Sequence, residues 1–158
     1  MSIKTKILLT IASVVLCSWL FGCGAQKVST RQPELSDGSD TNLTFLSVAH
    51  SAYNEEYFGG KLRAHIGLDE TQYMASTICE DDGSDCRINF NLRYTVAPRV
   101  ALITMLHEMC HEKTWMQDKD MLGKQIGHGY HWRSCMVLLD AEGAFRKIII
   151  DNYSEQVR

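Results

Sequence analysis

The chain has 158 residues, with 16 Lys and Arg against 19 Asp and Glu and a formal net charge of −3. Two of the basic residues, Lys4 and Lys6, stand in the N-terminal segment, so the remainder carries about five net negative charges. Because binding to nucleic acid depends on several Lys or Arg side chains neutralising phosphates, this balance argues against a nucleic-acid partner.

The N-terminus has the features of an export signal. Lys4 and Lys6 precede a mostly apolar block from Ile7 to Phe21, and small residues follow it. The block is shorter than the roughly 18 to 20 apolar residues that a transmembrane helix needs. Residues 1–22 are therefore predicted to be a signal peptide and not a permanent membrane span.

The sequence LFGC at residues 20–23 resembles the cleavage site of bacterial lipoproteins, in which the cysteine receives lipid and becomes the N-terminus. Cys17 fits this role less well because the bulky Leu16 precedes it. We therefore expect Cys23 to be acylated, and two or more acyl chains anchor a protein stably to a membrane. By resemblance to lipoprotein sorting in Gram-negative bacteria, Gly24 in place of Asp favours the periplasmic face of the outer membrane, if the source is Gram-negative. An ordinary secretory signal with an incidental cysteine is the alternative.

Residues 23–40 carry few large apolar side chains and are predicted to form a flexible tether after the lipidated cysteine. A flexible chain of that length has a reach of roughly 20 to 25 Å. Residues 41–158 then form the folded domain, which is long enough for one hydrophobic core.

The first half of this domain predicts one helix and three short strands. Apolar residues recur at helical spacing from Leu43 to Tyr57, with Asp40 or Thr41 as the N-cap and glycines 59 and 60 as the stop. Residues 61–68, 73–79 and 86–91 are predicted strands, and the last two form a hairpin around the acidic turn EDDGSD.

Cys79 and Cys86 stand at the two ends of that turn, where paired strands bring cysteines within bonding range. In an exported protein we expect a disulfide between them, with two separate thiols as the alternative. A structural zinc site on this pair is disfavoured, because such a site needs four ligands and no second pair lies nearby.

A long helix is predicted from Pro98 onward, and it contains the sequence LHEMCH. His107 and His111 are four residues apart, so both imidazoles project from one helix face and can bind one metal ion. Glu108 is offset by one position, which suits it to take a proton from metal-bound water. A further helix follows the sequence GHGYHW; Gly143 is expected to end it, and residues 144–153 fit either a helix or a strand.

The third ligand has to come from elsewhere, because two histidines make an incomplete zinc site. The metzincin pattern HExxHxxGxxH is excluded, since Thr114 and Gln117 occupy its later positions. A glutamate ligand is disfavoured because Glu142 lies far downstream. The candidate is His128, and His131 is the alternative.

Four segments together resemble the SprT-like zinc metalloprotease family. They are YNEEYFGGKL (53–62), ICEDDGSDCRINFN (78–91), LHEMCH (106–111) and HGYHW (128–132). The resemblance implies an α+β, minimal zincin-like fold with an N-terminal helix, a small three-stranded sheet, the HExxH helix and a following helix that carries the third ligand. It also implies one Zn²⁺ per chain, bound by His107, His111 and His128, with Glu108 as the catalytic base.

The function implied is that of a zinc metalloendopeptidase. Tyr130 is a candidate for steadying the oxyanion, because it is close to His128 in sequence, and the strand at 86–91 is expected to pair a free edge with an extended substrate. The best-known members of the family act inside cells on proteins at DNA, but this chain has an export signal and an acidic mature part and lacks a DNA-binding extension. We therefore expect a protein or peptide substrate in the cell envelope and no nucleic acid; no oligomeric state is predicted.

Three other functional hypotheses are open. The chain could be a catalytically silent, zinc-stabilised binding or scaffold lipoprotein that has the same ligands. It could be a nucleic-acid-associated protease like its intracellular relatives. HExxH could also be a helix pattern without metal, although the third histidine and the family context argue against that.

The remaining notable side chains have simpler interpretations. His50 and His65 are expected to be ordinary helix and strand residues, and Glu112 a solvated surface carboxylate. Cys110 and Cys135 are expected to be buried thiols, with a bond between the two helices as the alternative. Three further side chains are expected to pack in the interior: Trp115, Met116 and Trp132.

Overall fold

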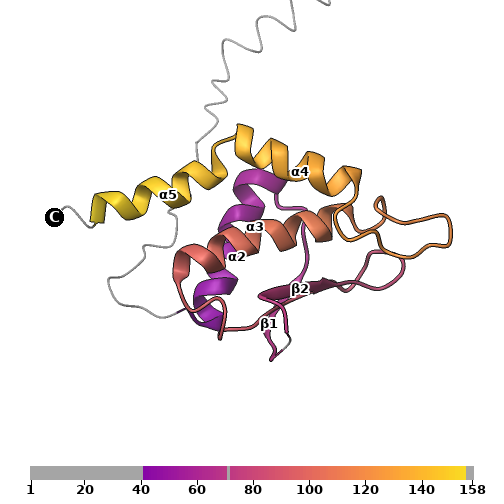
Figure 1. Ribbon diagram of the computed structural model, residues 1–158, viewed down its shortest axis with the longest axis horizontal. Coiled ribbons are helices and arrows are strands. Elements are labelled where there is room, and N and C mark those ends of the chain that lie inside the picture. Colours follow the sequence, from indigo (N-terminus) through magenta and orange to yellow (C-terminus); the bar gives the residue numbers. More distant parts are fainter. Residues whose placement is uncertain (1–40, 71, 156–158) are drawn as a thin grey trace, which may run out of the picture.

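The computed structural model describes residues 41–70 and 72–155, and these form an α+β domain (Figure 1). In chain order the elements are α2 (Leu43–Phe58), β1 (His65–Leu68), β2 (Ala75–Ile78), β3 (Arg87–Phe90), α3 (Pro98–Thr114), α4 (Tyr130–Ala141) and α5 (Ala144–Glu155). The predicted fold class and order of elements are confirmed. The predicted signal peptide (1–22) and the tether with Cys23 (23–40) lie outside the described residues.

The three strands form one small mixed sheet in the order β1-β3-β2. β2 and β3 are antiparallel, as the predicted hairpin requires, whereas β1 runs parallel to β3. Because β3 is hydrogen-bonded on both sides, the expectation that it offers a free edge to a substrate is wrong. Within the described part of the chain, β2 pairs on one side only, so its outer edge is the one that remains open.

Helix α3 lies in the middle of the domain, against α2, α4, α5 and β2 (Figure 1). It begins at Pro98, as predicted, and proline suits this position because the first helical N–H has no partner inside the helix. Neighbours on several sides bury most of its circumference, including Met105, Leu106 and Met109, which have no exposed surface. The helix that carries the HExxH sequence is therefore the rigid centre of the core.

Helix α2 is closed at both ends by local hydrogen bonds. Its N-cap is Asn42, whose side chain accepts from the Phe45 N–H at 2.9 Å, so the expected caps Asp40 and Thr41 are wrong. At the other end Gly59 adopts the left-handed conformation (φ 63°), as the predicted stop requires. Asn54 then bonds both the N–H and the carbonyl of Leu62, which fixes the turn into β1.

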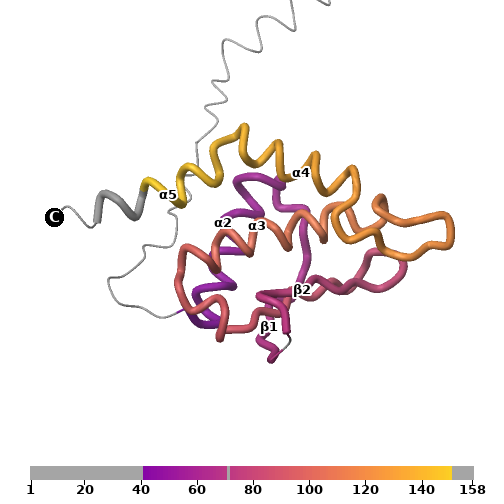
Figure 2. Tube along the Cα trace, viewed as in Figure 1, coloured from indigo at the N-terminus to yellow at the C-terminus, as the bar shows by residue number. Residues whose placement is uncertain are grey.

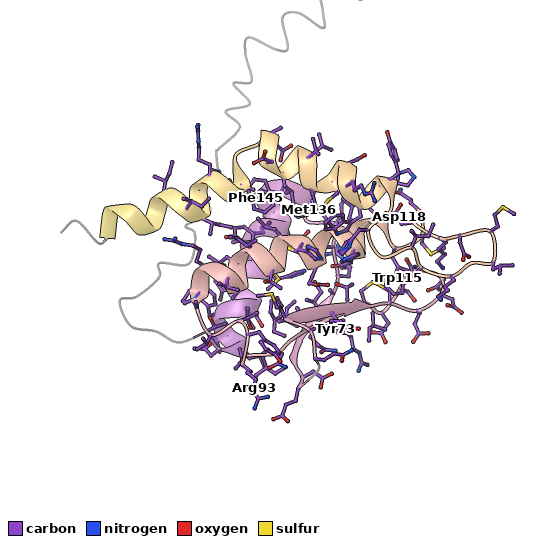
Figure 3. All side chains as sticks on the ribbon, in the orientation of Figure 1. Tyr73, Arg93, Trp115, Asp118, Met136 and Phe145 are labelled. Atoms are coloured by element: carbon purple, nitrogen blue, oxygen red, sulfur yellow. A yellow bond between two sulfur atoms is a disulfide. The ribbon has the colours of Figure 1, made fainter. Side chains whose placement is uncertain are left out.

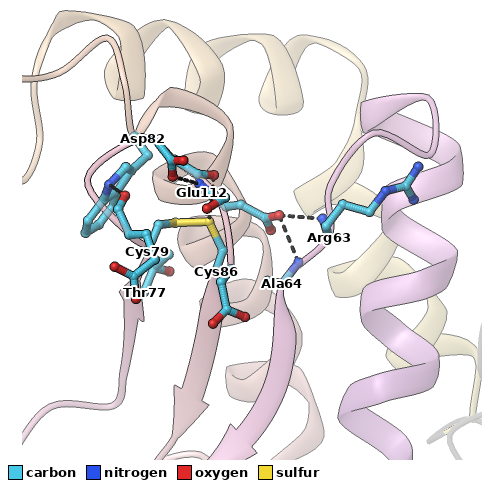
Figure 4. The surroundings of a disulfide bond; sticks show 12 residues. Arg63, Ala64, Thr77, Cys79, Asp82, Cys86 and Glu112 are labelled. Atoms are coloured by element: carbon cyan, nitrogen blue, oxygen red, sulfur yellow. Dashed lines mark hydrogen bonds between the residues drawn. A yellow bond between two sulfur atoms is a disulfide. The ribbon is translucent and has the colours of Figure 1, made fainter.

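The predicted disulfide between Cys79 and Cys86 is present, with an S–S distance of 1.96 Å (Figure 4). Both cysteines are largely buried, at 9% and 3% exposure, at the ends of the acidic turn between β2 and β3. The bond therefore ties the two strands together where they enter the turn.

Glu112 is not the solvated surface carboxylate that was expected. Its Oε1 accepts hydrogen bonds from the backbone N–H groups of Arg63 (2.5 Å) and Ala64 (2.9 Å), immediately before β1 (Figure 4). Its side chain is only 6% exposed, and His50 Nε2 lies 3.8 Å from its other oxygen. Its position on the helix correctly predicted that the side chain points away from the histidines. The prediction of exposure was wrong because Arg63 and Ala64, which are distant in sequence, cover this face of α3. Glu112 therefore fastens α3 to the start of the sheet.

The C-terminal part forms two consecutive helices. α4 ends at Ala141, and Gly143 follows with φ 79°, so the predicted break is confirmed. The ambiguous segment after it is the helix α5, which Lys147 ties to Glu56 of α2 by an ion pair. Within the described residues, no helix has both the length and the apolar character that crossing a membrane demands.

The loop between α3 and α4 extends from the body of the domain at the end opposite α5 (Figure 2). Its base is tied to the acidic turn, because Trp115 Nε1 donates to the Glu80 carbonyl (3.0 Å) and Lys119 Nζ to the Asp81 carbonyl (2.7 Å). At its tip Met121 and Leu122 are almost fully exposed, at 101% and 92%.

Candidate metal centre

Three imidazoles converge beside the middle of the domain. The Nε2 atoms of His111 and His128 lie 3.3 and 3.2 Å from the Nε2 atom of His107, and one ligand atom from each residue lies within 4.8 Å of the other two. Ligands of a tetrahedral zinc ion at 2.0 to 2.1 Å are about 3.3 Å apart, so this spacing matches one shared cation.

Two of the ligands come from one helix and the third from a different segment. His107 and His111 stand one turn apart on α3, as their spacing predicted. His128 lies two residues before α4 begins at Tyr130, so the third histidine precedes the helix that was expected to carry it. Among the described residues, the metal-binding group contains His128 and not the alternative His131.

The two helix histidines are neutral at physiological pH. Burial, together with a smaller contribution from nearby His128, lowers the pKa of His107 to about 4. The pKa of His111 is also lowered to about 4: burial is the largest cause, His107 and His128 act in the same direction, and Asp118 opposes them. A histidine has to be neutral to bind a metal, so these two nitrogens keep their lone pairs available.

The ring of Trp132 packs against all three imidazoles. Its ring centroid lies 4.7, 5.4 and 4.2 Å from those of His107, His111 and His128. Its Nε1 donates to the His107 carbonyl at 3.2 Å. Trp132 therefore packs against its neighbours, as expected. Its hydrogen bond also links α4 to the turn of α3 that carries His107 and His111.

Asp118 fixes the start of α4, and with it His128. Its carboxylate accepts from the backbone N–H groups of His131 (3.1 Å) and Trp132 (2.7 Å), which have no partners within the first turn of the helix. Gly129 makes room for this carboxylate, because a Cβ there would lie 2.4 Å from Asp118 Oδ1. Figure 3 labels Asp118 between the protruding loop and α4.

Glu108 is buried beside the histidines, with 6% exposure. Thr77 Oγ1 of β2 lies 2.7 Å from its Oε2 and 3.0 Å from its backbone carbonyl. Burial raises the pKa of Glu108, and the hydrogen bonds from Thr77 act in the opposite direction. The carboxylate is thus held in one orientation by the neighbouring strand, and its pKa lies above the usual value for a glutamate.

A cavity of about 430 Å³ adjoins this carboxylate. His107 and Glu108 form part of its wall, and most of the remaining lining is apolar, including Tyr73, Met74, Val100, Ile103 and Met136. In Figure 3 the labelled Tyr73 and Met136 lie on opposite sides of α3.

A second disulfide joins the two helices of the centre. Cys110 and Cys135 are bonded with an S–S distance of 2.02 Å, which is the alternative to the buried thiols expected here. Cys110 directly precedes His111 in α3, and Cys135 lies one turn beyond Trp132 in α4. The bond therefore holds the two metal-binding segments together.

The other candidate residues lie outside the centre. Tyr130 is 77% exposed and its ring contacts His131, so its role in steadying an oxyanion stays a prediction. His65 is exposed on β1 near Asp85, as expected for an ordinary strand residue. His50 is buried on α2 next to Glu112.

Comparison with known families agrees with this geometry. The sequence model described as the SprT-like family matches residues 46–153, which is more than half of the chain. The chain belongs to the SprT-like family. The match runs from within α2 to within α5 and includes all three histidines. No curated protein matches the chain.

The donor set of this SprT-like domain fits a zinc ion. Three imidazole nitrogens with the spacing given above, two of them kept neutral, leave room for a fourth ligand, which is the arrangement of catalytic zinc sites. Supporting groups that orient ligating histidines are typical of such sites, and here the His107 carbonyl, Trp132 and Asp118 supply the framework.

Sequence reasoning missed Thr77 and Asp118. Thr77 lies 31 residues before Glu108, and only the pairing of β2 beside α3 brings them together. For Asp118 a signal existed: an acidic residue before a GHG turn that opens a helix is a candidate to bind that helix's free N–H groups.

Proposed function

We propose that this SprT-like protein is a zinc-dependent endopeptidase of the cell envelope, exported and attached to a membrane through lipid on Cys23. The observation that supports catalysis most strongly is the joint placement of three converging imidazoles and a buried glutamate in the wall of an open cavity. The proposed location is the periplasmic face of the outer membrane if the source is Gram-negative. The two disulfides support export, since such bonds persist in oxidising compartments.

In the proposed mechanism, His107, His111 and His128 would hold Zn²⁺, which would supply Lewis acidity towards a water molecule and a carbonyl group. Glu108 accepts the proton of the attacking water and passes it to the leaving amine. Its raised pKa brings it closer to the working pH, which favours both transfers. The outer edge of β2, next to Glu108, is where an extended peptide would be aligned.

The test combines metal analysis with protease assays on the full-length protein. We expect one zinc per chain, loss of zinc in His128→Ala, and retention of zinc in the matched variant His131→Ala. Glu108→Gln should keep its zinc and lose cleavage of unfolded protein substrates by at least a hundredfold.

The results of the metal analysis and the protease assay distinguish the alternative functions. Zinc binding without Glu108-dependent cleavage would leave the zinc-stabilised scaffold lipoprotein as the function. Absence of zinc under zinc-replete conditions would overturn the proposal as a whole.

A further inference from the structure

The cavity beside Glu108 has the chemistry of a side-chain pocket. It measures about 430 Å³, far more than the roughly 30 Å³ that one water molecule occupies in the liquid, and falls within the usual range of ligand pockets. Among its lining residues Glu108 is the only one with a formal charge, and its carboxylate is already bonded to Thr77. An acidic ligand group would therefore find no partner of opposite sign in this lining, and the one carboxylate is the group that accepts the proton in the proposed mechanism, whereas an apolar group would be surrounded by apolar atoms.

Several of the apolar side chains that line the cavity are exposed. Tyr73 is 60% exposed, Met74 44% and Ile103 37%, and they gather between the start of β2 and the first half of α3. A contiguous apolar patch of this kind on a single chain usually marks a binding site. The position of this patch indicates that its ligand is a side chain of the substrate, because His107 and Glu108 line the same cavity.

The open edge of β2 leads to this cavity. Tyr73 and Met74 directly precede β2, and Ala75, its first residue, also lines the cavity. Side chains of an extended peptide alternate between two faces, so a peptide lying along this edge would turn every second side chain towards α3. The peptide residue whose side chain enters the cavity would then adjoin the peptide bond that lies next to His107 and Glu108.

From this arrangement we infer that the enzyme selects substrates with a large apolar residue adjacent to the scissile bond, and that Ile103 and Met136 determine this selectivity. The inference rests on the proposed function, which it deepens by naming the substrate class. Burying one such side chain contributes about 1.5 to 3 kcal/mol, which corresponds to about a 10- to 150-fold preference over a small residue.

The first arm of the test measures cleavage. The zinc-loaded full-length protein is given a proteome-derived peptide library, and the residues on both sides of each cut are identified by mass spectrometry. We expect Leu, Phe, Met and Ile to dominate one position. Ile103→Arg should lower cleavage of these peptides at least tenfold and favour Asp or Glu at that position, a gain that misfolding cannot produce.

The matched control is Val137→Arg, which introduces the same charge at an exposed apolar helix position (67% exposed) outside the cavity. It should leave the profile unchanged. Met136→Arg is the second cavity variant and should act as Ile103→Arg does. A profile without an apolar preference, or an equal change in Val137→Arg, would overturn the inference while leaving the peptidase function intact.

The second arm measures binding without turnover. Glu108→Gln protein is titrated with a fluorescent Gly-Ser decapeptide that has a central Leu-Phe pair, and with the same peptide carrying Ser-Ser or Lys-Lys instead. We expect at least tenfold tighter binding of the Leu-Phe peptide, reduced by Ile103→Arg. If this preference is found but wild-type protein cleaves nothing, the pocket stands and the peptidase proposal fails. Equal binding of all three peptides together with unselective or absent cleavage overturns the pocket.

Discussion

Thr77 is a neutral residue on a strand, yet its hydroxyl is the side-chain group that orients the buried carboxylate of Glu108. A hydrogen bond to a charged group is worth about 1.5 to 3 kcal/mol, enough to decide which rotamer a carboxylate occupies. The same contact opposes the effect of burial on the pKa of Glu108. Thr77 is therefore a positioning residue for the proposed base.

Replacing Thr77 by Val should lower kcat about tenfold to a hundredfold while zinc content stays at one per chain, because the ligands do not contact this hydroxyl. Without the hydrogen bond the pKa of Glu108 rises further, so the acid limb of the pH-rate profile should move to higher pH. Thr77→Ser keeps the hydroxyl and should restore both values. Equal kcat and an unmoved acid limb in Thr77→Val would show that the contact has no part in catalysis.

A residue of the candidate site could be predicted from the sequence where its relation to the other site residues is local. His107 and His111 could be predicted because their relation is local: four residues along one helix. His128 was reached by excluding other ligand patterns and by the family resemblance, since nothing local links it to α3. Thr77 could not be predicted at all, because its role depends on which strand lies beside α3.

At the scale of elements, the metal centre is a junction between α3 and the segment that opens α4. Three contacts close it: the Cys110–Cys135 disulfide, the Trp132 indole on the His107 carbonyl, and Asp118 on the first turn of α4. Because His128 belongs to a different segment from His107 and His111, we expect zinc affinity to depend on how firmly this junction is held.

Gly129→Ala should weaken zinc binding about tenfold, the lower end of what disturbing groups behind metal ligands costs. The added Cβ would lie 2.4 Å from Asp118 Oδ1, so either the carboxylate or the start of α4 has to move. Gly127→Ala is the matched control, because nothing lies within 4 Å of a Cβ there. Competition with a chromophoric chelator measures both affinities, and equal values for the two variants would refute this account of Gly129.

Removing the inter-helix disulfide with Cys110→Ser and Cys135→Ser should cost about 3.5 kcal/mol of unfolding free energy, against about 2.5 for Cys79→Ser with Cys86→Ser, because the first bond closes the longer loop. Chemical denaturation of the oxidised protein measures both. Zinc affinity should fall only in the first pair, since only that bond joins ligand-bearing segments. A loss of zinc affinity of the same size in both pairs would contradict the proposed junction.

Elements were predictable where the pattern is local, and less so where it depends on neighbours. Helical spacing and Pro98 located α2 and α3, and the paired segments around the acidic turn gave the hairpin. The place of β1 was not predictable, because a parallel partner depends on how the chain returns over the sheet. The prediction of a free edge on β3 failed for that reason, and the apolar triplet at 148–150 left α5 undecided because it suits either secondary structure.

In the whole molecule as proposed, a tether of about 17 residues joins the folded domain to a lipid anchor. On a flexible chain such a tether has a reach of roughly 20 to 25 Å, which would hold the active site close to the membrane surface. Proteins and peptides near the membrane would then be the accessible substrates.

Cys23→Ala should release the protein from the membrane fraction, since an acyl anchor contributes about 0.8 kcal/mol per buried methylene and nothing else in the tether replaces it. Cys17→Ala, a cysteine of the same N-terminal segment, should remain membrane-bound. Cell fractionation with palmitate labelling reads out both variants. Lipid incorporation that persists in Cys23→Ala would rule out this anchor site.

The tip of the loop between α3 and α4 has a chemical consequence of its own. Met121 presents its thioether fully to solvent, whereas Met105 and Met109 are enclosed in the core. An oxidant such as peroxide will therefore convert Met121 to the sulfoxide long before it reaches the interior methionines. In an aerobic environment, the mass of a proteolytic peptide that contains Met121 therefore measures how far the protein has been exposed to oxidants.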